Sequence, residues 1–144
     1  MPKSIENMML GEHDRLRNLL NLCLENLKHN PVIAEENFIK FKWNLEKHFF
    51  LEEKIIFSNP AVENSEHFEE AEEILDEHKE LLSFIKKIEE DKSGLHWQSI
   101  QELKKLVERH AAFEDEEFYP RLDEVLTIEQ KQEMIKESKK VLQP

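Results

Sequence analysis

Four histidines and two glutamates recur in this chain with a spacing that suits metal coordination. His48 precedes Glu52 by four residues, and His110 precedes Glu114 by four. Residues four apart project from one face of an α-helix at adjacent turns, so a metal or a bridged metal pair can reach both side chains. Two further histidines would each add one imidazole from another helix. The predicted metal ligands are therefore His13, His48, Glu52, His78, His110 and Glu114.

The two halves of the chain repeat this order of ligands. A Glu-His pair with a leucine three residues after the histidine occurs at His13 and again at His78. A His-x-x-x-Glu run follows in each half, at 48–52 and at 110–114. A twofold set of ligands suits two metals bridged by two carboxylates, and a repeated set is harder to produce by chance than one isolated pair.

One alternative ligand remains open at the level of sequence. Asp115 follows His110 by five residues, so a local distortion of the helix could bring it to the metals in place of Glu114. The spacing of four residues fits an undistorted helix and favours Glu114.

Other polar residues near the motifs have simpler interpretations. Glu12, Glu53 and Glu77 adjoin predicted ligands but lie on other helix faces, which predicts a solvated or supporting role. The three remaining histidines either lie off the apolar seams or lie several helical turns from the level of the predicted ligands. We therefore expect them at the surface or at helix ends. These are His29, His67 and His96.

The elements that must position the ligands follow from the apolar pattern. Helical stretches near 4–29, 34–57, 65–90 and 95–118 each carry interior positions in alternating steps of three and four. The predicted ligands fall on these seams, between apolar positions such as Met9 and Leu16, or Leu45 and Ile55. Short connections between the helices, at Pro31, 58–60 and 91–94, imply antiparallel neighbours. The fold class is all-α, an antiparallel up-down-up-down four-helix bundle.

The C-terminal part predicts one more element. Tyr119-Pro120 lies where the fourth helix should stop or kink. Thr127 and Gln130 form a capping box that opens a short final helix over about 127–140.

Length and composition set further bounds. The 144 residues fit a single domain over 1–144, and only 2 glycines and 5 prolines interrupt the helix-forming composition. A net charge of −12 argues against nucleic acid. Apolar runs stay well short of the roughly 20 residues of a membrane span, and a secretory leader is not expected at the N-terminus. The single Cys23 suits a reducing cytosol, so we expect a cytoplasmic protein.

The predicted glutamates are the reason to expect metal rather than a polar core. Burying an unpaired carboxylate in a helix bundle lowers the free energy of unfolding by several kcal/mol. The seams around Glu52 and Glu114 offer no neighbouring lysine or arginine. A divalent or trivalent cation would supply the missing positive charge.

At these residues the sequence resembles the hemerythrin-like (HHE cation-binding) family, from His13 through Glu114. The resemblance implies a non-haem di-iron centre with two iron ions. His13 and His48 would hold one iron, His78 and His110 the other, and Glu52 and Glu114 would bridge them; manganese or a mixed metal pair stays open. Oxygen-carrying members of the family have a fifth histidine where this chain has Ile74, so reversible oxygen carriage is not expected.

The resulting functional expectation is a protein that binds or reacts with O₂, NO or peroxide in sensing, storage or stress protection. One alternative is a small di-iron oxidoreductase, either a peroxidase or an NO-consuming or iron-centre-repair type. Another is an interaction module whose folding depends on iron. The sequence identifies no protein partner.

Overall fold

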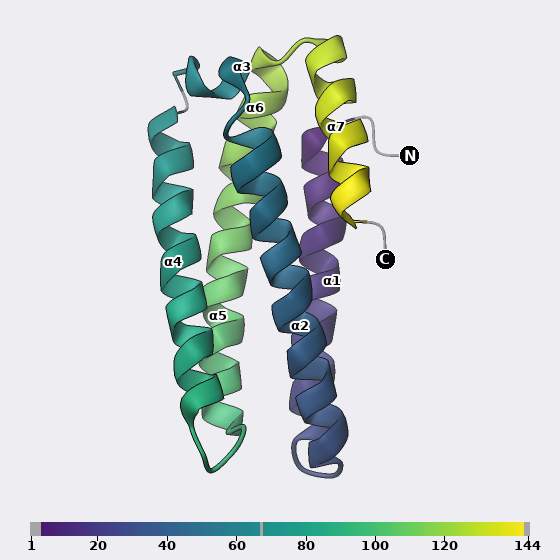
Figure 1. The fold of residues 1–144 in the computed structure, drawn as a ribbon, viewed down its shortest axis with the longest axis vertical. Coiled ribbons are helices and arrows are strands. Elements are labelled where there is room, and N and C mark those ends of the chain that lie inside the picture. Colours follow the sequence, from purple (N-terminus) through teal and green to yellow (C-terminus); the bar gives the residue numbers. More distant parts are fainter. Residues whose placement is uncertain (1–3, 67, 143–144) are drawn as a thin grey trace.

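The computed structural model describes residues 4–66 and 68–142, and the described chain is helical throughout its regular elements. Four long helices alternate in direction and lie side by side (Figure 1). This confirms the predicted all-α, up-down-up-down bundle. The four helices are α1 (Ile5–Asn26), α2 (Pro31–Leu51), α4 (Phe68–Glu90) and α5 (Trp97–Phe113).

Two of these helices continue through a widened π-helical turn. Segment η1 (Glu52–Ile56) extends α2, and η2 (Glu114–Phe118) extends α5. In each, a backbone N–H bonds the carbonyl five residues earlier, from Phe57 to Glu52 and from Tyr119 to Glu114. Three shorter helices complete the fold, namely α3 (Pro60–Glu63), α6 (Tyr119–Val125) and α7 (Ile128–Leu142).

The predicted helix limits need three corrections. The second helix begins at Pro31, not near residue 34, because proline at the first helical position lacks only an N–H that would be unpaired anyway. The connection before the third long helix contains the separate helix α3, and α4 begins at Phe68, not near residue 65. The fourth helix does not end at Tyr119-Pro120, because η2 leads directly into α6, which has Pro120 in its first turn.

The interior consists of two apolar clusters with the polar residues between them. The cluster at one end includes Met9, Ile74 and Phe118, and the other includes Leu16, Leu45 and Leu81. On each helix the predicted ligands fall between members of the two clusters. One interior position differs from the prediction: Ile56, not Ile55, is buried after Glu52, because the π turn adds a residue to the helical register.

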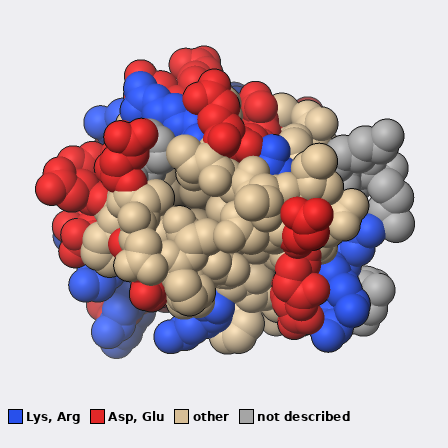
Figure 2. Space-filling model, turned by 90° about the horizontal axis from the view of Figure 1, so that it is seen from above, with Lys and Arg blue, Asp and Glu red and all other residues tan. Residues whose placement is uncertain are grey.

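The end of the bundle nearest the predicted ligands is closed by the C-terminal elements. Helix α7 lies along α1 and α2 (Figure 1) and buries Met134 and Ile135 in the first cluster. The predicted capping box is confirmed, because Thr127 and Gln130 exchange hydrogen bonds of 2.8 and 3.1 Å. Seen from above, this end is uncharged in its centre, with charged side chains around the margin (Figure 2). Among the described residues, no helix is long and apolar enough to cross a membrane.

Candidate metal centre

The structure brings all six predicted ligands into one buried layer. Glu52 and Glu114 are completely inaccessible to solvent. The four histidines come from four different helices and expose at most 4% of their surface. Their rings form two close pairs, His13 with His48 at 5.0 Å between centroids and His78 with His110 at 5.2 Å. These are the pairs that the family resemblance implies for the two irons.

Each glutamate reaches histidines of both halves. Glu114 Oε1 lies 2.8 Å from His13 Nε2, and Glu114 Oε2 lies 3.0 Å from His110 Nε2. Glu52 Oε1 lies 3.0 Å from His78 Nε2 and 3.2 Å from His48 Nε2. Both carboxylates therefore lie between the histidine pairs, within reach of rings from each half.

The π turns begin at the two glutamates. Each of them has its N–H directed at the histidine carbonyl four residues earlier, so the His-x-x-x-Glu spacing itself stays α-helical. The widening follows after the glutamate. Single π turns inside α-helices are frequent at functional sites, and here they fall at equivalent places in both halves of the chain.

The distortion does not place Asp115 among the inner carboxylates. Asp115 Oδ1 lies 2.7 Å from Nδ1 of His13, on the outer side of that ring. Glu114 faces Nε2 of the same ring. Glu114 therefore lies inside the centre, and Asp115 lies outside and orients His13; that Glu114 is the metal ligand stays a prediction.

Acidic residues form an outer layer around the histidines. Glu53 repeats the Asp115 arrangement in the other half of the chain, with Oε2 2.9 Å from His78 Nδ1. Glu77 Oε1 lies 3.4 Å from His110 Nδ1. A carboxylate on Nδ1 fixes the ring tautomer and leaves Nε2 to face the centre. The arrangement is not repeated in full at His48 and His110, because within the described residues the Nδ1 atoms of both rings are buried without a hydrogen-bond partner.

Tyr119 is a site residue that the sequence analysis missed. Its hydroxyl donates a short hydrogen bond to Glu52 Oε2, and the whole side chain is buried. Burial and then the nearby carboxylates raise its pKa well above the ordinary value of 10.0, so the hydroxyl keeps its proton. A signal was available, because Tyr119 is the chain's one tyrosine and follows Glu114 by five residues.

The centre holds opposite charges in contact. Burial lowers the pKa of His48 and His110, but the carboxylates of Glu52 and Glu114 outweigh this and raise the two values to about 10 and about 11. Burial opposes ionisation of Glu114, yet His110 and the other histidines hold its pKa well below 4.5. Without metal, Glu52 and Glu114 are therefore ionised, and His48 and His110 carry balancing protons.

The donor set fits metal ions better than it fits hydrogen bonds. Within the described part of the chain, both ring nitrogens of His48 and of His110 are buried without a hydrogen-bond partner, although carboxylate oxygens lie within 3.2 Å of their Nε2 atoms. Those contacts are close but poorly directed. Two groups could each hold an ion: Glu52, His78, His110 and Glu114, and separately His13, His48 and Glu114. Ligation by these six residues stays a prediction, but their chemistry and positions suit it.

The other histidines do not join the centre. His29 and His96 are exposed, and His96 lies beside Asp91 and Ser93 at the start of α5. His67 lies outside the described residues.

Comparison with known families agrees with this geometry. Residues 4–138 match the model of the hemerythrin HHE cation-binding domain. No curated protein and no solved structure was matched by the chain. Since the family match covers nearly all of the 144 residues, the chain belongs to the hemerythrin HHE cation-binding family.

Proposed function

We propose that this protein holds two iron ions between the histidine pairs and binds or reacts with O₂, NO or peroxide in sensing, storage or stress protection. The observation that carries the proposal is the pair of fully buried carboxylates, Glu52 and Glu114. Within the described residues, both are paired only with histidines and the Tyr119 hydroxyl, never with Lys or Arg. A mixed imidazole and carboxylate set suits iron or manganese, whereas zinc favours closed four-coordinate sites.

The protein's own residues would hold the centre in shape. Asp115 and Glu53 hydrogen-bond Nδ1 of His13 and His78 and so keep these two imidazoles turned with Nε2 inward. Tyr119 restrains one oxygen of Glu52 and leaves the other for the metals. Phe49 stacks on His78 at 3.7 Å between centroids and walls off the pocket from water. When bound, reduced iron would supply the electrons and ligand positions that O₂ or NO requires.

A small cavity supports access by a small ligand. It measures about 90 Å³ and lies between α4 and α5, against His110. Glu77, Arg109 and Leu106 are among the residues that line it. One water needs roughly 10–15 Å³ of such space, so the pocket has room for a diatomic molecule or peroxide beside His110. We place the function in the cytosol, where the single Cys23 stays reduced.

The decisive experiment is metal analysis followed by ligand addition. The chain is loaded anaerobically with Fe(II), and its iron content and visible absorption are recorded before and after O₂ or NO. We expect about two irons per chain, as two bridged sites require, and a new absorption band. The double variant H48A/H110A should lose both.

The matched control is H29A, which removes an exposed imidazole and should behave like wild type. Circular dichroism checks that each variant remains helical. Equal iron in wild type and in a folded H48A/H110A variant would refute the proposed centre. Iron without any spectral response to O₂, NO or peroxide would refute ligand chemistry there.

The alternative function, a small oxidoreductase, would use the same metal centre. Catalytic turnover distinguishes it from a protein that only binds its ligand. Repeated consumption of peroxide or NO with an added reductant would indicate catalysis. A single stoichiometric change would indicate binding or sensing.

A further inference from the structure

The outward face of α2 carries a row of large apolar side chains that no described element covers. Val32, Ile39, Trp43 and Phe50 are 69, 64, 57 and 52% exposed. At about 100° per residue, the four point within about 20° of one common direction. This row, the α2 stripe, is opposite the buried face that carries His48. A soluble helix places polar residues on such a face, so the stripe indicates an interaction surface.

The spacing of the stripe is the same in both directions. Its members are separated by seven, four and seven residues. This is the spacing of the contact positions in a pair of packed helices. If a second α2 runs antiparallel, Ile39 meets the partner's Trp43 and Val32 meets the partner's Phe50. Every member then has an apolar counterpart, as a twofold interface requires. We propose that the α2 stripe binds the α2 stripe of a second copy of this chain, antiparallel, to form a homodimer.

Charge along one edge of the stripe favours this arrangement. Glu36 and Lys47 lie about 40° and 60° to the same side of the stripe. In the antiparallel pair, Glu36 falls within one residue of the level of the partner's Lys47, and the twofold axis repeats the contact. Lys47 Nζ already lies 4.3 Å from the Trp43 ring centroid, which holds it at the seam.

The opposite edge is less favourable and limits the affinity. There Glu46 approaches the level of the partner's Glu35, so like charges meet. Lys42 on that side is engaged with Glu89 of α4 at 2.8 Å. The dimer should therefore be of moderate strength, and removing this repulsion should tighten it.

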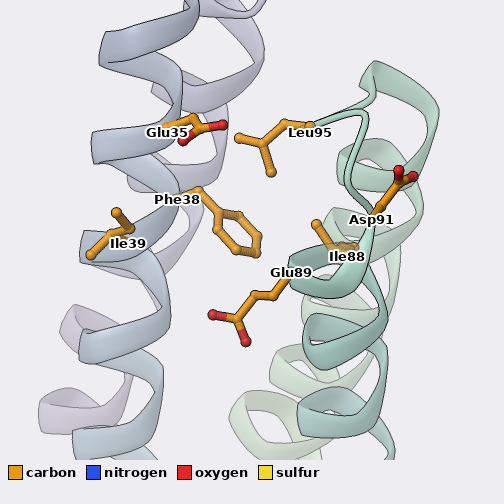
Figure 3. A pocket seen from close by; sticks show the side chains of 8 residues that line it. Glu35, Phe38, Ile39, Ile88, Glu89, Asp91 and Leu95 are labelled. Atoms are coloured by element: carbon orange, nitrogen blue, oxygen red, sulfur yellow. The ribbon is translucent and has the colours of Figure 1, made fainter.

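A cleft beside the stripe enlarges the contact. It has a volume of about 210 Å³ and lies between α2 and the end of α4, with Phe38, Ile88 and Leu95 in its wall. Figure 3 shows Ile39 at its edge on α2. The cleft lies on the edge of the stripe that carries Glu35, so a second α2 packed on the stripe would run beside it.

The exposed area is consistent with a reversible dimer. The four side chains expose on the order of 400–500 Å² per subunit, taking the usual size of large apolar side chains. A standard interface buries about 800 Å² per partner. The stripe supplies roughly half of this, and the charged edge and the cleft add to it. We expect a Kd roughly in the micromolar range.

The test is sedimentation equilibrium of the metal-loaded chain from about 1 to 500 μM. The dimer fraction should rise with concentration, and I39E should raise Kd at least about tenfold by placing a charge in the seam. The matched control is I128E, the same substitution at an apolar residue that is 70% exposed on α7. It should leave Kd unchanged. A monomer at all concentrations, or equal effects of I39E and I128E, would overturn the proposal.

Charge variants test the direction of pairing. K47E should weaken the dimer about 3- to 10-fold over two ion pairs, and E36K/K47E should restore it because both partners swap sign. E46K should tighten it. If I39E disrupts the dimer but E36K/K47E fails to restore what K47E loses, the antiparallel pairing is wrong. A W97F variant leaves Trp43 as the one tryptophan, and its emission should shift to the red on dilution.

Discussion

Replacing each of two adjacent acids, Glu114 and Asp115, by its amide would distinguish the predicted inner ligand from the residue that orients His13. Glu114 is fully buried and belongs to both candidate metal groups. E114Q keeps the volume but removes the charge from both. Breaking one partner out of a buried ion pair costs about 3–5 kcal/mol, which corresponds to a loss of about 10²- to 10³-fold in metal affinity. We expect E114Q to lose both metals.

D115N should lower metal affinity less than E114Q does, and at only one of the two candidate metal sites. Asp115 contacts only the outer nitrogen of His13 and lies 3.7 Å from Arg17. Loss of such a supporting carboxylate costs about 10- to 100-fold in metal affinity. Because His13 belongs to one of the two groups, D115N should weaken one metal and spare the other.

The assay is competition with a chromophoric chelator, with metal content measured after dialysis and helix content checked by circular dichroism. D14N is the matched control, because Asp14 also pairs with Arg17 but is 71% exposed. It should keep wild-type affinity for both metals. If D115N strips both metals while E114Q retains them, Asp115 is the bridging ligand and the reasoning from the inner position of Glu114 is wrong.

Three further predictions concern buried polar groups. Y119F should lower the melting temperature by roughly 3–10 °C, because a hydrogen bond to the charged Glu52 contributes about 1.5–3 kcal/mol; an unchanged melting temperature would show that this bond adds nothing. In metal-free protein, the pKa values of His48 and His110, about 10 and about 11, exceed their unfolded value near 6.5. Their stabilisation is therefore complete below pH 6.5 and is lost as pH rises toward 10. Melting of metal-free protein should fall over that range while metal-loaded protein does not, and parallel pH profiles would contradict this. Burial raises the pKa of Cys23 to about 11, so a thiol reagent at pH 8 should label it slowly in folded protein and rapidly in urea; fast labelling of the folded chain would refute its burial.

Much of the centre could be predicted because helical periodicity fixes which residues point inward. His13 lies between Met9 and Leu16, and His78 lies between Ile74 and Leu81, all buried as the seams required. A residue between two buried apolar neighbours on one face has no route to solvent. The burial of the ligands therefore followed from the apolar pattern alone.

The parts that escaped prediction depend on the π turns. Such a turn has no reliable residue pattern, because it differs from an α-helix by one inserted residue in the hydrogen-bond ladder. It moved the buried position from Ile55 to Ile56. After Glu114 it also carried the chain past Pro120 into α6, which placed Tyr119 against Glu52. The sequence analysis expected the helix to stop or kink at Tyr119-Pro120 and gave the tyrosine no role.

The position of the π turns explains how the bundle can hold charge before metal is present. Each turn starts at the glutamate that ends a His-x-x-x-Glu run, so the histidine stays on a regular helix while the acid after the glutamate is redirected. Glu53 and Asp115 thereby reach histidines on α4 and α1, across the bundle. His13 and His78 are oriented by carboxylates at their outer nitrogens, and His48 and His110 are protonated against the inner carboxylates. Metal uptake then exchanges those protons within a preformed site, so affinity should rise with pH. A metal affinity that is independent of pH would mean that the inner imidazoles are not protonated in the metal-free chain.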